Sequence, residues 1–158
     1  MDKQELFIQM ALKAWDTHIS KTTKYFDSIS DEDMQNEIAP GKNRIVYLLG
    51  HLIAVNDGMI AFYDKGDRQY AHLDDAYVNN PDKVVSDVTS VSTLRAAWKQ
   101  SNEKLSSIFA SMSTADWFSR HTAMTDEDHQ KEPWRNKLNV LLNRTNHVAY
   151  HLGQLVLA

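Results

Sequence analysis

The sequence predicts an all-α fold, a four-helix bundle with a long connection between its second and third helices. Four segments repeat their apolar residues at every third or fourth position, which is the period of an amphipathic helix. Glycine, proline and polar clusters separate these segments, and no stretch alternates apolar and polar residues as a half-buried strand does. A chain of 158 residues can form one substantial core, so we expect a single domain over residues 1–158.

The first two predicted helices begin at capping residues. Helix one covers about residues 2–29, and Asp2 followed by Glu5 has the spacing of a capping box. Its expected apolar side consists of Phe7, Met10, Ala11, Ala14, Ile19, Thr22, Phe26 and Ile29. Helix two begins near Asn43, a favourable N-cap residue, and ends at about Tyr63.

A long connection over residues 64–91 follows helix two. So many residues can carry the chain along the whole length of a bundle, and we therefore expect the second and third helices to be parallel neighbours. Helix three begins near Ser92, and a polar loop over residues 113–132 follows it. Pro133 suits the first turn of helix four, which is expected to continue to the end of the chain.

Composition excludes several classes of function. The net charge is −4, and lysine and arginine are scattered among acidic residues, which argues against nucleic-acid binding. The chain has no cysteine, so it contains neither a disulfide nor a thiolate nucleophile. The first residues lack the basic and apolar pattern of a secretory signal, and the apolar stretch at 45–55 is too short to span a bilayer. We therefore expect a cytoplasmic protein with no membrane partner.

Three histidines are the strongest functional signal. His147 and His151 are four residues apart on helix four, so their side chains project from the same side. His51 interrupts the apolar helix two, and all three lie at the flanks of the apolar stripes. Two imidazoles from one helix and one from another can form a metal site with an open coordination position. A single histidine on a helix flank is more often merely solvated or hydrogen-bonded, so the prediction depends on all three together.

The surrounding residues resemble a known family. The segment Leu48-Leu49-Gly50-His51-Leu52 and the C-terminal segment from Asn146 to Gln154 are similar to the two histidine motifs of the DinB-like (DinB/YfiT-like) family. The resemblance covers the whole chain in helix order and length. It implies a four-helix bundle that binds one divalent metal, usually nickel or zinc, through His51, His147 and His151. Several members of that family are thiol-dependent transferases or isomerases that use bacillithiol, mycothiol or related small thiols.

The metal prediction leaves several functions open. Imidazole suits zinc, nickel, cobalt, copper and iron(II) alike, and manganese is a further candidate, so the ligands do not select the metal. A metal with a free position can acidify water, hold a thiolate or polarise a carbonyl group. Among these, the family resemblance implies a metal-dependent transferase or isomerase acting on a small electrophile with a small thiol. The alternatives are a metal-dependent hydrolase and a non-catalytic stress-related bundle with a structural metal. A di-iron site is excluded, because no Glu-x-x-His pair occurs.

Four further residues are candidates for the pocket or for supporting the ligands. His18 lies on the inner half of helix one, and Tyr47 and Tyr150 lie near the motif histidines. Gln154 either hydrogen-bonds a ligand imidazole or ties helix four to a neighbouring helix. Asn56 and Asp57 are close enough to His51 in sequence to support its ring, whereas His121 and His129 are expected to be exposed to solvent. Helix four is apolar over more than half of its circumference near its end, which favours a homodimer.

Overall fold

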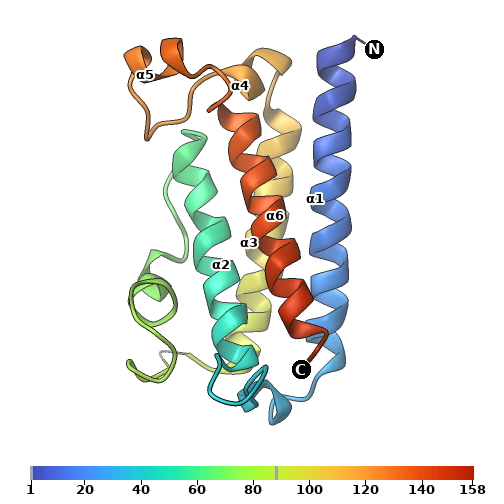
Figure 1. Ribbon diagram of the computed structural model, residues 1–158, viewed down its shortest axis with the longest axis vertical. Coiled ribbons are helices and arrows are strands. Elements are labelled where there is room, and N and C mark those ends of the chain that lie inside the picture. Colours follow the sequence, from blue (N-terminus) through green and yellow to red (C-terminus); the bar gives the residue numbers. More distant parts are fainter. Residues whose placement is uncertain (1, 88) are drawn as a thin grey trace.

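The computed structural model describes residues 2–87 and 89–158, and it is all-helical over these residues (Figure 1). The predicted all-α class is confirmed, since within these residues the only β-type pairing consists of the isolated bridges Glu37–Arg44 and Arg120–Asn136. The α-helices are α1 (Lys3–Ser28), α2 (Ile45–Phe62), α3 (Val91–Ser111), α4 (Thr114–Phe118), α5 (Asp126–Lys131) and α6 (Lys137–Leu155). Short 3₁₀-helices occur at η1 (Asp33–Gln35) and η2 (Ala71–Leu73), and η3 (Asp75–Asn79) is a turn of π-helix.

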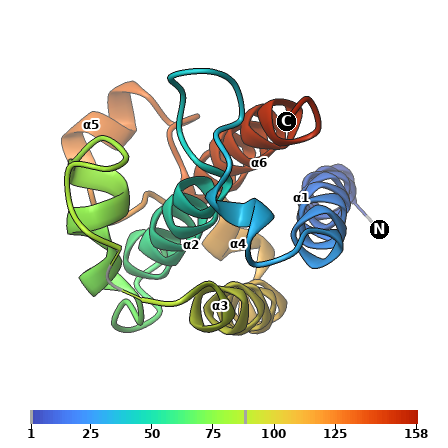
Figure 2. The same ribbon diagram turned by 90° about the horizontal axis from the view of Figure 1, so that it is seen from below.

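The four long helices α1, α2, α3 and α6 lie alongside one another (Figures 1 and 2). In Figure 1, α1 and α6 run downward, whereas α2 and α3 run upward. The main packing pairs are α1 with α6, α2 with α3, and α2 with α6. The parallel pair α2 and α3 is joined by the long connection, as the sequence predicts. The antiparallel pair α2 and α6 places the middle of α2 beside the C-terminal half of α6.

Side-chain caps mark the starts of α1 and α6 but not that of α2. Asp2 and Glu5 form the predicted capping box of α1. The N-cap of α2 is Arg44 rather than Asn43. Arg44 makes no side-chain cap, and its backbone N–H and guanidinium donate to the carboxylate of Asp82. The predicted fourth helix corresponds to α6, and Pro133 is not part of it. Helix α6 begins later, where the side chain of Asn136 accepts a hydrogen bond from the backbone N–H of residue 139.

The buried side of α1 differs from the predicted one. Ile8 and Trp15 are buried, whereas Phe7 and Met10 are 47% and 61% exposed. The buried residues of this helix are Ile8, Ala11, Trp15, Thr22 and Phe26. Both sets have helical spacing, and the large buried Trp15 ring, which packs against Phe109, determines which side faces the core.

Both predicted loops contain helical structure. The connection after α2 includes η2 and η3, and Leu73, Ala76 and Tyr77 on them are buried. The buried carboxylate of Asp57 holds the start of this connection, because it accepts from the backbone N–H groups of residues 69 and 70. The segment after α3 includes α4 and α5, and Trp117 of α4 is buried. The connection is therefore packed against the bundle and can position groups beside α2.

Helix α2 is the most apolar helix of the chain. Its 18 residues, Ile45–Phe62, are long and apolar enough to cross a membrane by length and composition alone, and 72% of them are buried inside the protein. This apolar stretch is longer than the residues 45–55 considered in the sequence. Its burial is that expected of a helix at the centre of a packed core.

Candidate metal centre

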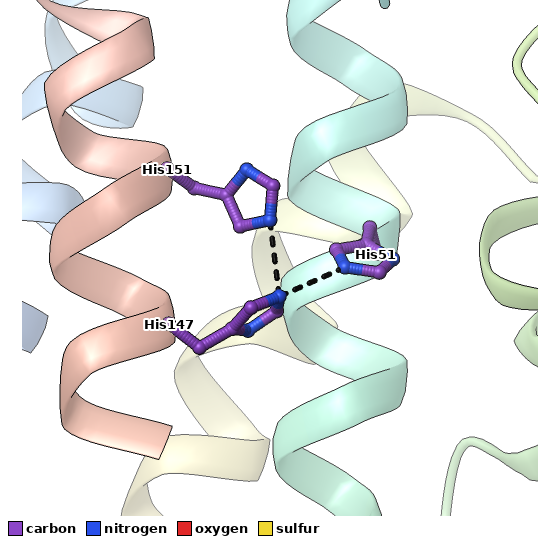
Figure 3. A group of neighbouring side chains, drawn as sticks. All are labelled: His51, His147 and His151. Atoms are coloured by element: carbon purple, nitrogen blue, oxygen red, sulfur yellow. Dashed lines mark hydrogen bonds between the residues drawn. The ribbon is translucent and has the colours of Figure 1, made fainter. Parts of the chain in front are cut away.

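The three motif histidines converge between α2 and α6 (Figure 3). His51 comes from α2, and His147 and His151 come from successive turns of α6. The Nε2 atoms of His51 and His147 are 3.2 Å apart, and those of His147 and His151 are 3.0 Å apart. The candidate ligand atoms of the three residues all lie within 4.8 Å of one another. The structure therefore brings together the three side chains that the sequence predicted as ligands.

A backbone carbonyl orients His51. Its Nδ1–H donates to the carbonyl oxygen of Tyr77 over 2.7 Å, which leaves the lone pair on Nε2, the atom that faces the other two histidines. Gly50 allows this arrangement, because a Cβ there would lie 2.6 Å from atoms of the Tyr77 ring. The glycine next to His51 thus lets η3 approach α2 closely enough for its backbone to hold the imidazole.

Gln154 orients His151. The Nδ1–H of His151 donates to Oε1 of Gln154 over 2.7 Å, and Nε2 of the same amide donates to the hydroxyl of Tyr150 over 3.3 Å. The lone pair of His151 is therefore also on Nε2. Of the two roles considered for Gln154, the structure shows the hydrogen bond to a candidate ligand. At the neighbouring Gly153 a Cβ would have no atom within 4 Å, so no close packing requires glycine there.

The polar atoms at the centre fit a cation. His51 and His151 each present an acceptor to Nε2 of His147, and a neutral His147 has at most one proton there to donate. A cation among the three atoms would satisfy all of their lone pairs. Metal–nitrogen bonds of about 2.0–2.1 Å place neighbouring ligand nitrogens roughly 2.9–3.4 Å apart for angles from 90° to tetrahedral. The observed separations of 3.0 and 3.2 Å lie within that range.

Burial keeps the three imidazoles neutral. Desolvation, followed by the effects of His151, His51 and Arg144, lowers the pKa of His147 to about 4. Burial also lowers the pKa of His51 and of His151, although their hydrogen bonds to Tyr77 and Gln154 act in the opposite direction. A metal ligand must be deprotonated, so rings that remain neutral near pH 7 are suited to the role. His151 is buried rather than at an open flank, whereas His51 and His147 are partly exposed.

Of the other candidate residues, two tyrosines contact the three histidines and one histidine does not belong to the group. The ring of Tyr47 stacks on His51 with a centroid distance of 6.2 Å, and its hydroxyl donates to the carbonyl of Asn80. Tyr150 is 63% exposed and contacts the His151 ring edge-on. His18 lies on α1 and is not part of the three-histidine group, which spans only α2 and α6. Tyr47, Tyr150 and Gln154 therefore surround the ligand rings, whereas His18 does not contribute a ligand.

Several sequence-based assignments need correction. Asp57 does not support His51, because its carboxylate binds Arg68 and the start of the connection. The side chain of Asn56 is buried and has no hydrogen-bond partner among the described residues. His121 and His129 are half-buried rather than exposed. The carbonyl of Tyr77 was missed, because a backbone acceptor supplied by a distant segment leaves no signature in side-chain spacing.

The comparison with protein families agrees with the two motifs. The family model described as the DinB superfamily matches residues 14–155, which include all three histidines and both segments that carry them. A search of curated protein sequences finds no match. Because the match covers most of the chain, this protein belongs to the DinB superfamily.

Proposed function

We propose that His51, His147 and His151 bind one divalent metal ion, zinc or nickel, and that the protein is a metal-dependent enzyme that transfers a small thiol to a small electrophile. The observation that carries the proposal is the convergence of three neutral imidazoles. The Nε2 atoms of His51 and His151 lie 3.2 and 3.0 Å from that of His147, and two of the rings are held through Nδ1. Hydrogen bonds of this kind to the remaining ring nitrogen are typical of metal-bound histidine.

The chain's own residues support this chemistry in three ways. The carbonyl of Tyr77 and the amide of Gln154 hold the lone pairs of two rings toward one point. His51 and His147 are partly exposed, as access of a substrate from solvent requires. Because the chain has no cysteine, the thiol must come from a cosubstrate. When bound, the metal would supply the charge that holds a thiol as a thiolate or polarises the electrophile.

The same donors would also suit a metal-dependent hydrolase or a structural metal, so the test must separate these functions. Protein purified without a histidine tag is analysed for zinc and nickel. It is then assayed with cysteine and chlorodinitrobenzene, where a sulfur–carbon bond forms, the carbon–chlorine bond breaks and the thiol proton passes to solvent. We expect the wild type to retain about one metal ion and to lose transfer activity on chelation. Retained metal without transfer activity would favour the hydrolase or the structural metal.

The comparison of His51→Ala and His147→Ala tests the same proposal. Each change leaves two ligands, so we expect a sharp loss of metal and activity while the protein remains folded. The exposed His72 provides a matched control, and His72→Ala should keep both properties. A structural metal predicts instead that chelation itself unfolds the wild type. Wild-type protein that takes up neither zinc nor nickel at micromolar concentration would contradict the proposal.

We further propose a single domain over residues 1–158, a four-helix-bundle architecture of the DinB type, a cytoplasmic location and a homodimer. The exposed Phe7 and Met10 on α1 support pairing through an apolar helix face. Light scattering should give twice the mass of one chain, and a monomer at high concentration would contradict the dimer.

A further inference from the structure

Two stripes of residues, one on α2 and one on α6, include the three histidines and continue beyond them along the helices. On α2 the stripe consists of His51, Val55, Gly58 and Phe62, and on α6 of Val140, Arg144, His147 and His151. At about 100° per residue, each set lies within a sector of about 60°, so each lies on one side of its helix. Because the two helices are antiparallel neighbours, the two stripes run beside each other away from the histidines (Figure 1).

The two stripes end at a cavity. Phe62, His121, Val140, Asn143 and Arg144 line a cavity of about 180 Å³, in which the rings of Phe62 and His121 are 5.6 Å apart. Gly58 lies between this cavity and His51 along α2, and a Cβ at Gly58 would have no atom within 4 Å. The helix surface between the three histidines and the cavity therefore has open space beside it.

Arg144 is the unusual residue of this cavity. The five other arginines of the chain, Arg44, Arg68, Arg95, Arg120 and Arg135, each form an ion pair with a carboxylate. Arg144 is half-buried, and within residues 2–87 and 89–158 its guanidinium has no ion pair; its buried Nε has no hydrogen-bond partner. Burial lowers the pKa of Arg144 from its ordinary value, which reflects the cost of keeping this cation away from water. A guanidinium that is partly removed from water and has no anion beside it destabilises a protein, and a bound anion would offset that cost.

We propose that Arg144 binds a carboxylate group of the substrate or thiol cosubstrate, while the reactive end of that molecule lies at the three histidines. This inference rests on the function proposed above. The planar guanidinium matches a carboxylate with two parallel hydrogen bonds. The cavity offers one cationic side chain, Arg144, beside the polar side chains of His121 and Asn143 and the apolar side chains of Phe62 and Val140. A single cation matches a singly charged group better than a phosphate. Position 144 is only about 4.5 Å along the helix axis from position 147, so one small molecule can reach both places.

The first experiment uses metal-free protein and does not depend on the metal proposal. The side-chain Nε–H signal of Arg144 is followed by nuclear magnetic resonance and assigned by its loss in Arg144→Gln. We expect sodium propionate to shift this signal in a saturable manner, whereas sodium chloride at equal ionic strength does not. The signal of the exposed Arg135 serves as an internal control. An Arg144 signal that responds equally to propionate and chloride would overturn the proposal.

The second experiment connects Arg144 to the three histidines. In cobalt-substituted protein, the visible spectrum reports binding of a thiolate, and mercaptopropionate is compared with its uncharged methyl ester. We expect the acid to bind at least about tenfold more tightly, the size of a charge-assisted hydrogen bond. Arg144→Gln should remove this preference without changing the affinity for the ester, and Arg144→Lys should restore part of it.

Two controls separate the possible failures. Arg135→Gln should keep the preference for the acid, and Arg144→Gln should keep or raise the melting temperature, because its guanidinium binds no other residue of the described chain. If Arg144→Gln keeps the full preference, the role of Arg144 is overturned while the metal site stands. If cobalt is not taken up, the proposed function fails, and the propionate titration alone decides whether Arg144 binds a carboxylate.

Discussion

Replacement of Gly50 by alanine tests how the connection positions His51. A Cβ at this residue would lie 2.6 Å from two atoms of the Tyr77 ring and 2.8 Å from a third. Ordinary carbon–carbon contacts are about 3.5–4.0 Å, so the ring would have to withdraw by about 1 Å. Tyr77 is 1% exposed and lies against Tyr47, with ring centroids 5.9 Å apart, so its ring cannot simply turn into solvent. The backbone of η3 must therefore move.

This movement should affect the candidate ligand. The hydrogen bond from His51 to the Tyr77 carbonyl is 2.7 Å long, and lengthening by about 1 Å would break it. Loss of such a support typically weakens metal binding by about 10–100-fold. Overpacking costs about 1–3 kcal/mol, while alanine in a helix interior gains about 1 kcal/mol over glycine. We therefore expect Gly50→Ala to lower the free energy of unfolding by about 0–2 kcal/mol.

The assay combines zinc competition against a chelating indicator with urea unfolding of the metal-free protein. Gly58→Ala is the matched control, because Gly58 lies on the same helix and a Cβ there has no atom within 4 Å. It should leave zinc affinity unchanged and raise the free energy of unfolding by up to about 1 kcal/mol. If Gly50→Ala binds zinc as tightly as the wild type and is stabilised as much as Gly58→Ala, the reasoning is wrong.

Two further predictions follow from single contacts. Gln154→Ala removes the acceptor of His151 Nδ1–H, so zinc affinity should fall by about 10–100-fold with little change in melting temperature; the same affinity as wild type in the competition assay would refute the role of Gln154. Burial alone would raise the pKa of Asp82, but hydrogen bonds from Arg44 outweigh it and hold that pKa below 3.8. Asp82→Asn should therefore lower the free energy of unfolding by about 1–3 kcal/mol at pH 7. The pKa of Asp82 is lower in the folded than in the unfolded protein, so its stabilising effect is lost as the pH falls below about 4. Urea unfolding at decreasing pH should therefore show the difference in free energy of unfolding between wild type and Asp82→Asn disappearing.

The sequence alone was sufficient to predict the helical class and the placement of His147 and His151 on one side of a helix. The period of apolar residues distinguishes helix from strand without any tertiary information, so the four long helices could be placed to within a few residues. The spacing of His147 and His151 puts both side chains on one side of α6 in any structure where that segment is helical. These predictions depend only on local geometry, and for that reason the structure retains them.

The residues that support the site could be identified only in the folded molecule. Arg44, the N-cap of α2, hydrogen-bonds to Asp82, which is 38 residues away, and the orientation of His51 depends on a carbonyl 26 residues away. The choice of Ile8 and Trp15 over Phe7 and Met10 as the buried side of α1 likewise depends on packing against other helices. The sequence also could not show that Arg144 lacks an ion-pair partner, because pairing depends on which carboxylates lie near the guanidinium in the folded protein. Contacts between distant segments form only once the chain is packed, so residue spacing cannot specify them.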